Sequence, residues 1–300
     1  MQDLAWTMAG VRHASRLYSL LLKQNLQTNS KGNFHVSAAD PPTQFLEIKD
    51  EEAGLTREIA YAKSPGPRTP GIIYIPGFMS DKSGIKAVSL YKFCQENGFP
   101  YVRYDPSGLG ESKGVKITQV TFSHWVRDAR EILLRVTEGP QLVVCSSMGG
   151  WITSIIAQEH PAKFNSILMI APGINFHIRY EKELRSQLDE KGLKKYEAGG
   201  VVPLYNPDYG SFPLMKAQFD DMRKCALSLE ANSLDVTCPV RIIHGLKDKD
   251  VPFMESLTLL KALKGPDSHL QYLKDGDHRL ASEEKIKLIC DKILEMTSPK

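Results

Sequence analysis

The chain has 300 residues, enough for one large α/β domain or two small ones, and its 42% hydrophobic and 24% charged residues are ordinary for a folded protein. With 38 basic and 35 acidic residues the net charge is only +3, so electrostatics favour no nucleic-acid partner. The five cysteines are scattered and include no Cys-x-x-Cys pair, so neither a zinc site nor a disulfide framework is indicated. No apolar run reaches the roughly 18 to 20 residues of a transmembrane helix.

Residues 1–43 form an N-terminal extension that differs in composition from the rest. Basic residues interrupt apolar ones, and Asp3 is the only acidic residue before Asp40. This bias is typical of a transit peptide, whereas a secretory signal has an uninterrupted apolar core. No cleavage site is identifiable, so an extension without a targeting role is the alternative. We interpret residues 25–42 as a linker.

From residue 44 onward, short apolar strands alternate with longer helical segments, a pattern that predicts a mostly parallel sheet covered by helices on both faces. The expected strands are 45–48, 58–62, 71–75, 101–104, 141–146, 167–171, 240–243 and 269–273. The expected helices are 85–96, 122–136, 148–158 and 283–294. Together they predict one α/β domain over residues 44–300, with eight strands.

Residues 173–235 interrupt this pattern between the sixth and seventh expected strands. The insertion holds more apolar and aromatic residues than a solvated connector needs. They could line an acyl pocket beneath a lid, or they could pack the insertion onto the body of the domain. Within it, residues 179–195 are expected to form a solvated helix face.

A strained turn between a strand and a helix is predicted at residues 145–149. Ser147 follows a Val-rich strand and precedes a glycine-led helix, the context in which a Gly-x-Ser-x-Gly turn exposes a nucleophilic hydroxyl. Cys145 departs from that pattern, which has glycine at this position, and we expect Gly149 and Gly150 to leave room for the thiol. The alternative is that the serines only cap the helix.

With this turn the chain resembles the α/β-hydrolase superfamily, and two further loops strengthen the resemblance. Residues 244–252 resemble the family's His-Gly-x-x-Asp-x-x-Val-Pro acid loop, in which Asp248 occupies the acid position. Residues 276–279 resemble its histidine loop, which places His278 before the final helix. The resemblance implies a triad of Ser147, Asp248 and His278, in the chain order of this fold.

Three residues near these loops are rival candidates. Asp250 occupies a variable position before Val-Pro and is expected to be a solvated loop acid. His244 lies too close to the acid loop to serve as the base. Asp277 neighbours His278, and adjacent residues seldom face each other.

The oxyanion of such a reaction needs two backbone donors. The resemblance implies the amide of Met148, after the nucleophile, and the amide of Phe78, in the loop after the strand 71–75. Gly77 would allow the close backbone approach that this requires.

A further loop, at residues 104–112, resembles the superfamily's Asp-x-x-Gly-x-Gly-x-Ser signature, and we interpret it as structural. Its glycines do not complete a nucleotide-binding fingerprint, because Lys113 stands where the third glycine belongs. We therefore expect no cofactor and no metal.

A narrower resemblance is to the family of α/β-hydrolase domain-containing protein ten, and it rests on residues 70–78, 146–151, 238–245 and 277–279. This resemblance implies that the chain is a mitochondrial palmitoyl-protein thioesterase that also cleaves acyl glucuronides. The implied substrate is an S-acylated protein or a small acyl ester. A general carboxylesterase or lipase-like esterase, and a catalytically inactive hydrolase-fold binding module, are the alternatives.

Overall fold

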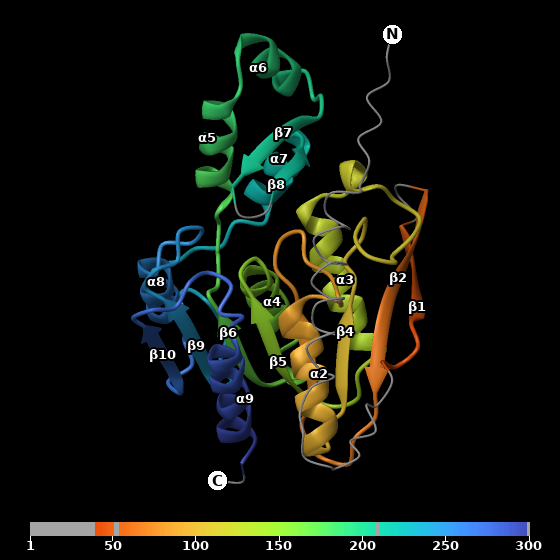
Figure 1. The fold of residues 1–300 in the computed structure, drawn as a ribbon, viewed down its shortest axis with the longest axis vertical. Coiled ribbons are helices and arrows are strands. Elements are labelled where there is room, and N and C mark those ends of the chain that lie inside the picture. Colours follow the sequence, from red (N-terminus) through yellow and green to blue (C-terminus); the bar gives the residue numbers. More distant parts are fainter. Residues whose placement is uncertain (1–39, 51–53, 208–209, 299–300) are drawn as a thin grey trace, which may run out of the picture.

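Eight strands pair into one sheet in the computed structural model, which describes residues 40–50, 54–207 and 210–298 (Figure 1). The strands are β1 (Gln44–Asp50), β2 (Leu55–Ser64), β3 (Gly71–Ile75), β4 (Tyr101–Tyr104), β5 (Gln141–Ser146), β6 (Phe164–Ile170), β9 (Val240–Gly245) and β10 (Ser268–Leu273). Their order is β1-β2-β4-β3-β5-β6-β9-β10, with antiparallel pairing of β1 to β2 and of β2 to β4 and parallel pairing beyond. The predicted mostly parallel, eight-stranded sheet is confirmed, while the expected transit peptide lies outside the described residues.

Helices cover both faces of the sheet. One face carries α2 (Ile85–Asn97) and α9 (Glu283–Thr297), and the other carries α3 (Phe122–Arg135), α4 (Gly149–Glu159) and α8 (Met254–Ala262). Side chains alternate along a strand, so in β3 Ile72 and Tyr74 join the first layer, whereas Ile73 and Ile75 join the second. Central strands are thus buried on both faces, which is why they appear in the sequence as continuous apolar runs.

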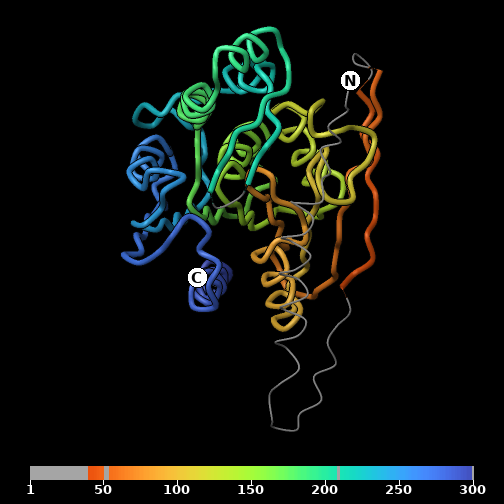
Figure 2. Tube along the Cα trace, turned by 45° about the horizontal axis from the view of Figure 1, so that its top comes forward, coloured from red at the N-terminus to blue at the C-terminus, as the bar shows by residue number. Residues whose placement is uncertain are grey.

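The insertion between β6 and β9 forms a separate layer. It consists of α5 (His177–Gln187), α6 (Glu190–Glu197), the antiparallel pair β7 (Val202–Asn206) and β8 (Gly210–Leu214), and α7 (Lys216–Lys224). Figures 1 and 2 show it, coloured green to cyan, gathered at one end of the sheet. The single helical segment expected over 179–195 is divided, because the carboxylate of Asp189 accepts the amide hydrogen of Gly192 at 2.7 Å and starts a new helix. No helix in the described part of the chain is long and apolar enough to cross a bilayer.

A buried ion pair joins β2 to helix α3, and both of its members form hydrogen bonds with Ser107 in the loop after β4. Arg57 Nη1 donates to Asp128 Oδ1 at 2.6 Å and to Ser107 Oγ at 2.8 Å, while the Ser107 amide donates to Asp128 Oδ2 at 2.8 Å. Both charged side chains are 0% exposed. Burial raises the pKa of Asp128 to about 6, although Arg57 and Ser107 oppose the shift. Neither charge therefore has water to replace a lost partner.

Replacing Arg57 with methionine should lower the free energy of unfolding by about 3 to 5 kcal/mol at pH 8, because Asp128 is then buried without its partner. This loss in the free energy of unfolding should be smaller at pH 5, where the Asp128 carboxyl takes up a proton. A carboxyl whose pKa is raised by folding stabilises the fold below its unfolded pKa, and this contribution disappears as the pH rises through the folded pKa. Denaturant unfolding at the two pH values measures the difference.

The double variant Arg57→Met with Asp128→Leu is the control. It removes both charges and should recover most of the stability. An equal loss in the single and double variants, with no dependence on pH, would contradict the role given to this pair.

Candidate active site

The turn after β5 holds Ser147 in the left-handed region of backbone conformation, with φ of 52°. Residues other than glycine seldom adopt this conformation, and a hydrogen bond from the Ser147 amide to the Ile170 carbonyl oxygen, at 2.9 Å, supports it here. Helix α4 begins two residues later, at Gly149. A Cβ at that position would lie 2.5 Å from the carbonyl oxygen of Ile75, so only glycine lets the helix start this close to β3. The Ser147 side chain is thereby presented at the carboxyl edge of the sheet.

Cys145 is fully buried within β5, with its sulfur 3.8 Å from the carbonyl oxygen of Leu168 on the neighbouring strand. Burial raises the pKa of the thiol to about 12, so it stays protonated and unreactive. The role expected of Gly149 and Gly150 in making room for this thiol stays a prediction. The atoms nearest to these glycines belong to the end of β3 and to Pro172.

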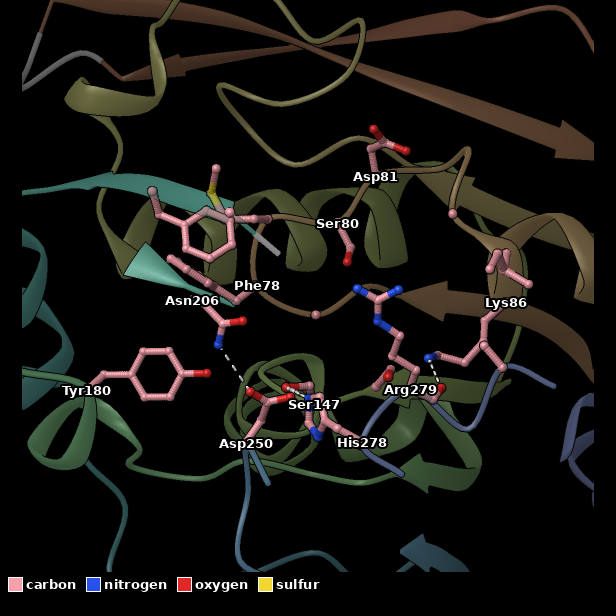
Figure 3. A pocket seen from close by; sticks show the side chains of 18 of the residues that line it. Phe78, Ser80, Asp81, Lys86, Ser147, Tyr180, Asn206, Asp250, His278 and Arg279 are labelled. Atoms are coloured by element: carbon pink, nitrogen blue, oxygen red, sulfur yellow. Dashed lines mark hydrogen bonds between the residues drawn. The ribbon is translucent and has the colours of Figure 1, made fainter. Parts of the chain in front are cut away.

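Ser147, His278 and Asp248 form a continuous row of hydrogen bonds. His278 Nε2 lies 3.0 Å from Ser147 Oγ, and His278 Nδ1 lies 2.7 Å from Asp248 Oδ2. Figure 3 shows Ser147 and His278 side by side. The loops after β9 and β10 meet because Gly245 has no side chain, since a Cβ there would lie 2.2 Å from the carbonyl oxygen of Gly276. The three residues singled out from the sequence are therefore in contact.

Asp248 accepts four hydrogen bonds. Its Oδ1 accepts from the amides of Asp250 and Val251 at 2.9 and 2.8 Å, and its Oδ2 accepts from His244 Nε2 and His278 Nδ1 at 2.9 and 2.7 Å. Burial by itself would raise the pKa of Asp248, but the hydrogen bonds to the two histidines outweigh it and hold the pKa well below its usual range. Because the carboxylate stays ionised, His278 keeps its hydrogen on Nδ1 and leaves Nε2 able to accept one from a serine hydroxyl.

Two residues that were set aside on sequence grounds lie within the site. The ring of His244 contacts Asp248, and its Nδ1 lies 2.6 Å from Ser256 Oγ. Asp250, expected to be a solvated loop acid, is half-buried and lines the cavity above Ser147, with its Oδ1 3.4 Å from Asn206 Nδ2 of the insertion. The His-Gly-x-x-Asp spacing was the available signal for the first contact. Nothing in the sequence pointed to the second.

The cavity above Ser147 has a volume of about 710 Å³ and lies between the body and the insertion. Figure 3 shows Phe78 and Tyr180 on one side of Ser147, and Arg279 and Lys86 on the other. The aromatic side extends to the β7–β8 hairpin, where the ring centroid of Phe212 lies 5.6 Å from that of Phe78. On the charged side, Lys86 Nζ donates to the carbonyl oxygen of Arg279 at 2.5 Å. The cavity is thus mainly apolar on the Phe78 side, where Asn206 and Asp250 also lie, and basic on the other side.

The loop that carries Phe78 is held close to the turn at Ser147. A Cβ on Gly77 would lie 3.1 Å from the Ser147 Cβ, so the two backbones approach each other closely. Asp105 braces the far end of this loop through Lys82, whose amide and Nζ donate to its carboxylate at 2.7 and 2.8 Å. The loop of residues 104–112 therefore supports the Phe78 loop.

Asp248, Asp250 and His278 offer ligand atoms that all lie within 4.8 Å of one another, which makes them a metal-compatible group among the described residues. Asp248 Oδ2 and His278 Nδ1 already share a hydrogen at 2.7 Å. A cation bound through these two atoms would have to replace that hydrogen.

Comparison with known proteins places the chain in a family. Residues 72–197 match the family described as serine aminopeptidase, S33, and residues 142–295 match the prolyl oligopeptidase family. The mitochondrial palmitoyl-protein thioesterase ABHD10 of mouse is 35% identical over 232 residues, which cover 77% of this chain and 76% of the relative. Its human counterpart is 32% identical over 239 residues, 77% and 74% of the two chains.

Solved structures agree with the sequence matches. Mouse α/β-hydrolase domain-containing protein 10 superposes with a TM-score of 0.71 at 33% identity, over 84% of this chain and 98% of that one. A putative hydrolase from Agrobacterium vitis S4 superposes with a TM-score of 0.76 at 26% identity, over 86% and 99%. These similarities are those of a serine hydrolase of ester or thioester bonds. The chain therefore belongs to the α/β-hydrolase family, in the group that includes palmitoyl-protein thioesterase ABHD10.

Proposed function

We propose that this chain is a thioesterase that removes acyl groups, palmitoyl above all, from S-acylated proteins, and that it also cleaves acyl glucuronides. The observation that carries the proposal is the hydrogen-bonded row of Ser147, His278 and Asp248 at the boundary between the apolar and charged sides of the cavity. The substrate class is supported by the thioesterase named among the relatives.

In the first half of the reaction, Ser147 Oγ attacks the carbonyl carbon of the acyl group while His278 Nε2 takes its proton. The Asp248 carboxylate stabilises the imidazolium. The bond from carbon to sulfur or oxygen then breaks, and His278 returns the proton to the leaving thiol or alcohol. An ester between the acyl group and Ser147 remains.

In the second half, His278 deprotonates a water molecule, which attacks this ester and releases the carboxylic acid while Ser147 recovers its proton. Both tetrahedral intermediates carry a negative oxygen that accepts hydrogen bonds from the Phe78 and Met148 amides. Loss of one such donor typically costs about 3 kcal/mol of transition-state stabilisation.

The acyl chain occupies the apolar side of the cavity, beneath the hairpin of the insertion. This side of the cavity is lined by Phe78, Tyr180, Leu204 and Phe212. Each methylene buried there contributes about 0.8 kcal/mol, so a palmitoyl chain gains more from this surface than an acetyl group. The leaving group faces the charged side, where Lys86 and Arg279 lie.

The triad assignment predicts how the protein reacts with a fluorophosphonate probe. Wild-type protein should be labelled on Ser147, and Ser147→Ala should not be labelled. Asp248→Asn should slow labelling by about a thousandfold or more, since an amide cannot hold His278 in the required tautomer. Labelling is measured as the rate of covalent adduct formation by mass spectrometry.

Asp250→Asn is the matched control for the acid. It carries the same substitution two residues away, and its labelling rate should stay within about tenfold of wild type, because Asp248 still holds His278 Nδ1 at 2.7 Å. Equal losses in the two variants, or no labelling of folded wild-type protein, would argue against the triad. The second result would favour an inactive binding module.

Leu204→Asn should lower kcat/KM for an S-palmitoyl peptide by about tenfold or more, while hydrolysis of an S-acetyl peptide changes little, because only the long chain reaches that surface. Tyr205→Asn is the matched control, since its side chain lies on the opposite face of β7 and is 59% exposed. The readout is a panel of S-acyl peptides, acyl glucuronides and short oxygen esters. Turnover of short oxygen esters alone would replace the thioesterase with a general carboxylesterase or lipase-like esterase.

The basic N-terminal extension should direct the protein to mitochondria, as the names of the ABHD10 relatives indicate for those proteins. A reporter fused after residue 43 should colocalise with a mitochondrial marker in cells. Replacing Arg12, Arg16 and Lys23 with glutamine should abolish import, because such signals depend on positive charge. A diffuse distribution of the unaltered fusion would show that the extension has no targeting role.

A further inference from the structure

His244 shares the carboxylate of Asp248 with His278. Its Nε2 lies 2.9 Å from Asp248 Oδ2 and 3.2 Å from the carbonyl oxygen of Val251. Both of these atoms only accept hydrogen bonds, so Nε2 must carry a hydrogen. The oxygen that accepts this hydrogen is the same Oδ2 that accepts from His278 Nδ1.

The second ring nitrogen of His244 faces Ser256 of helix α8, whose Oγ lies 2.6 Å from Nδ1. Both side chains are 0% exposed. A hydroxyl can donate to an unprotonated nitrogen, so a ring that carries its hydrogen on Nε2 is satisfied at both nitrogens. One hydrogen-bonded row therefore crosses the site, in the order Ser256, His244, Asp248, His278 and Ser147.

We propose that His244 is a positioning residue: the hydrogen on its Nε2 fixes Oδ2 of Asp248 and withdraws part of the carboxylate's charge, which sets how strongly Asp248 holds the protonated form of His278. His244 acts through Asp248 and does not touch the substrate. The effect expected on the pH profile of kcat/KM rests on the proposed hydrolase function. The effect expected on the NMR signals of His278 rests on the hydrogen bonds alone.

Sharing one oxygen between two donors has an effect on position and an effect on charge. Two backbone amides hold Oδ1, so without His244 the other oxygen would keep His278 as its one side-chain partner. A carboxylate oxygen with two donors attracts each hydrogen less strongly than one with a single donor. Removing His244 should therefore strengthen the attraction for the His278 imidazolium, which would persist to higher pH.

Other titratable groups face the same region. A carboxylate oxygen of Asp250 lies within 4.8 Å of ligand atoms of Asp248 and His278, and Tyr272 is the register partner of His244 on β10. The cavity wall carries the charged residues Asp81, Lys86, Glu183 and Arg279. An ion pair beside helix α8 joins Arg179 and Glu255. A substitution at position 244 leaves all of them in place, so a difference between two such variants isolates the ring.

The test compares His244→Leu, which fills the space without a donor, with His244→Gln, whose amide nitrogen can donate in place of Nε2. In the pH profile of kcat/KM, His244→Leu should lower the plateau by about tenfold or more and move the acid limb up by about half a pH unit. His244→Gln should retain most of the plateau and the position of the limb. Ser256→Ala should shift the limb in the same direction but less, because Nε2–H becomes a weaker donor.

His269→Leu is the matched control, since it removes an exposed histidine from the neighbouring strand β10 and should leave the profile unchanged. Thermal unfolding establishes that each variant is folded. If His244→Leu does not fold, the pair His244→Gln and Ser256→Ala carries the comparison, with the larger shift expected in Ser256→Ala.

A second readout needs no turnover. In a Ser147→Ala background, the NMR signals of the His278 ring should change at a pH about half a unit higher in His244→Leu than in the protein with His244. Absence of turnover in wild-type protein would count against the proposed function, and this titration would still decide the role of His244. Equal rate losses in His244→Leu and His244→Gln, with no movement of the acid limb or of the ring signals, would assign His244 a purely structural role and overturn the proposal.

Discussion

The left-handed backbone of Ser147 is the constraint on which the site depends. A residue in this conformation reverses the chain between β5 and α4 within two residues, so that its side chain leaves the sheet instead of packing into it. The reversal is possible because Gly149 passes within van der Waals contact of the end of β3. Strain at one position is thereby supported by close packing at another, and the proposed nucleophile has a fixed place.

The parallel sheet then determines what the nucleophile meets. The carboxyl ends of β5, β9 and the neighbouring β10 lie along the same edge, so the loops that follow them can meet although Ser147 and His278 are 131 residues apart. The absence of side chains at Gly245 and Gly276 lets two of these loops touch. The insertion covers this edge, and with it the cavity gains an apolar wall that the sheet alone could not supply.

The sequence predicted the central strands well because their chemistry is local. The bounds expected for β3, β4 and β5 agree with the structure, since strands buried on both faces appear as mainly apolar runs, and each of these three directly follows a proline. The insertion was harder, since Pro203 and Pro213 stand opposite each other in the β7–β8 hairpin and conceal it from a strand pattern. The place of His244 was also missed, because its contact depends on a turn that only the folded loop defines.

The buried pair of Arg57 and Asp128 also constrains how this protein can change over evolutionary time. Each charge is tolerable only with the other present, so a substitution at one position leaves an unpaired charge in the interior unless the second position changes as well. Two coordinated changes are needed where most surface positions need one. The loop of residues 104–112, which supports the Phe78 loop, is therefore attached to the fold at two positions that must change together.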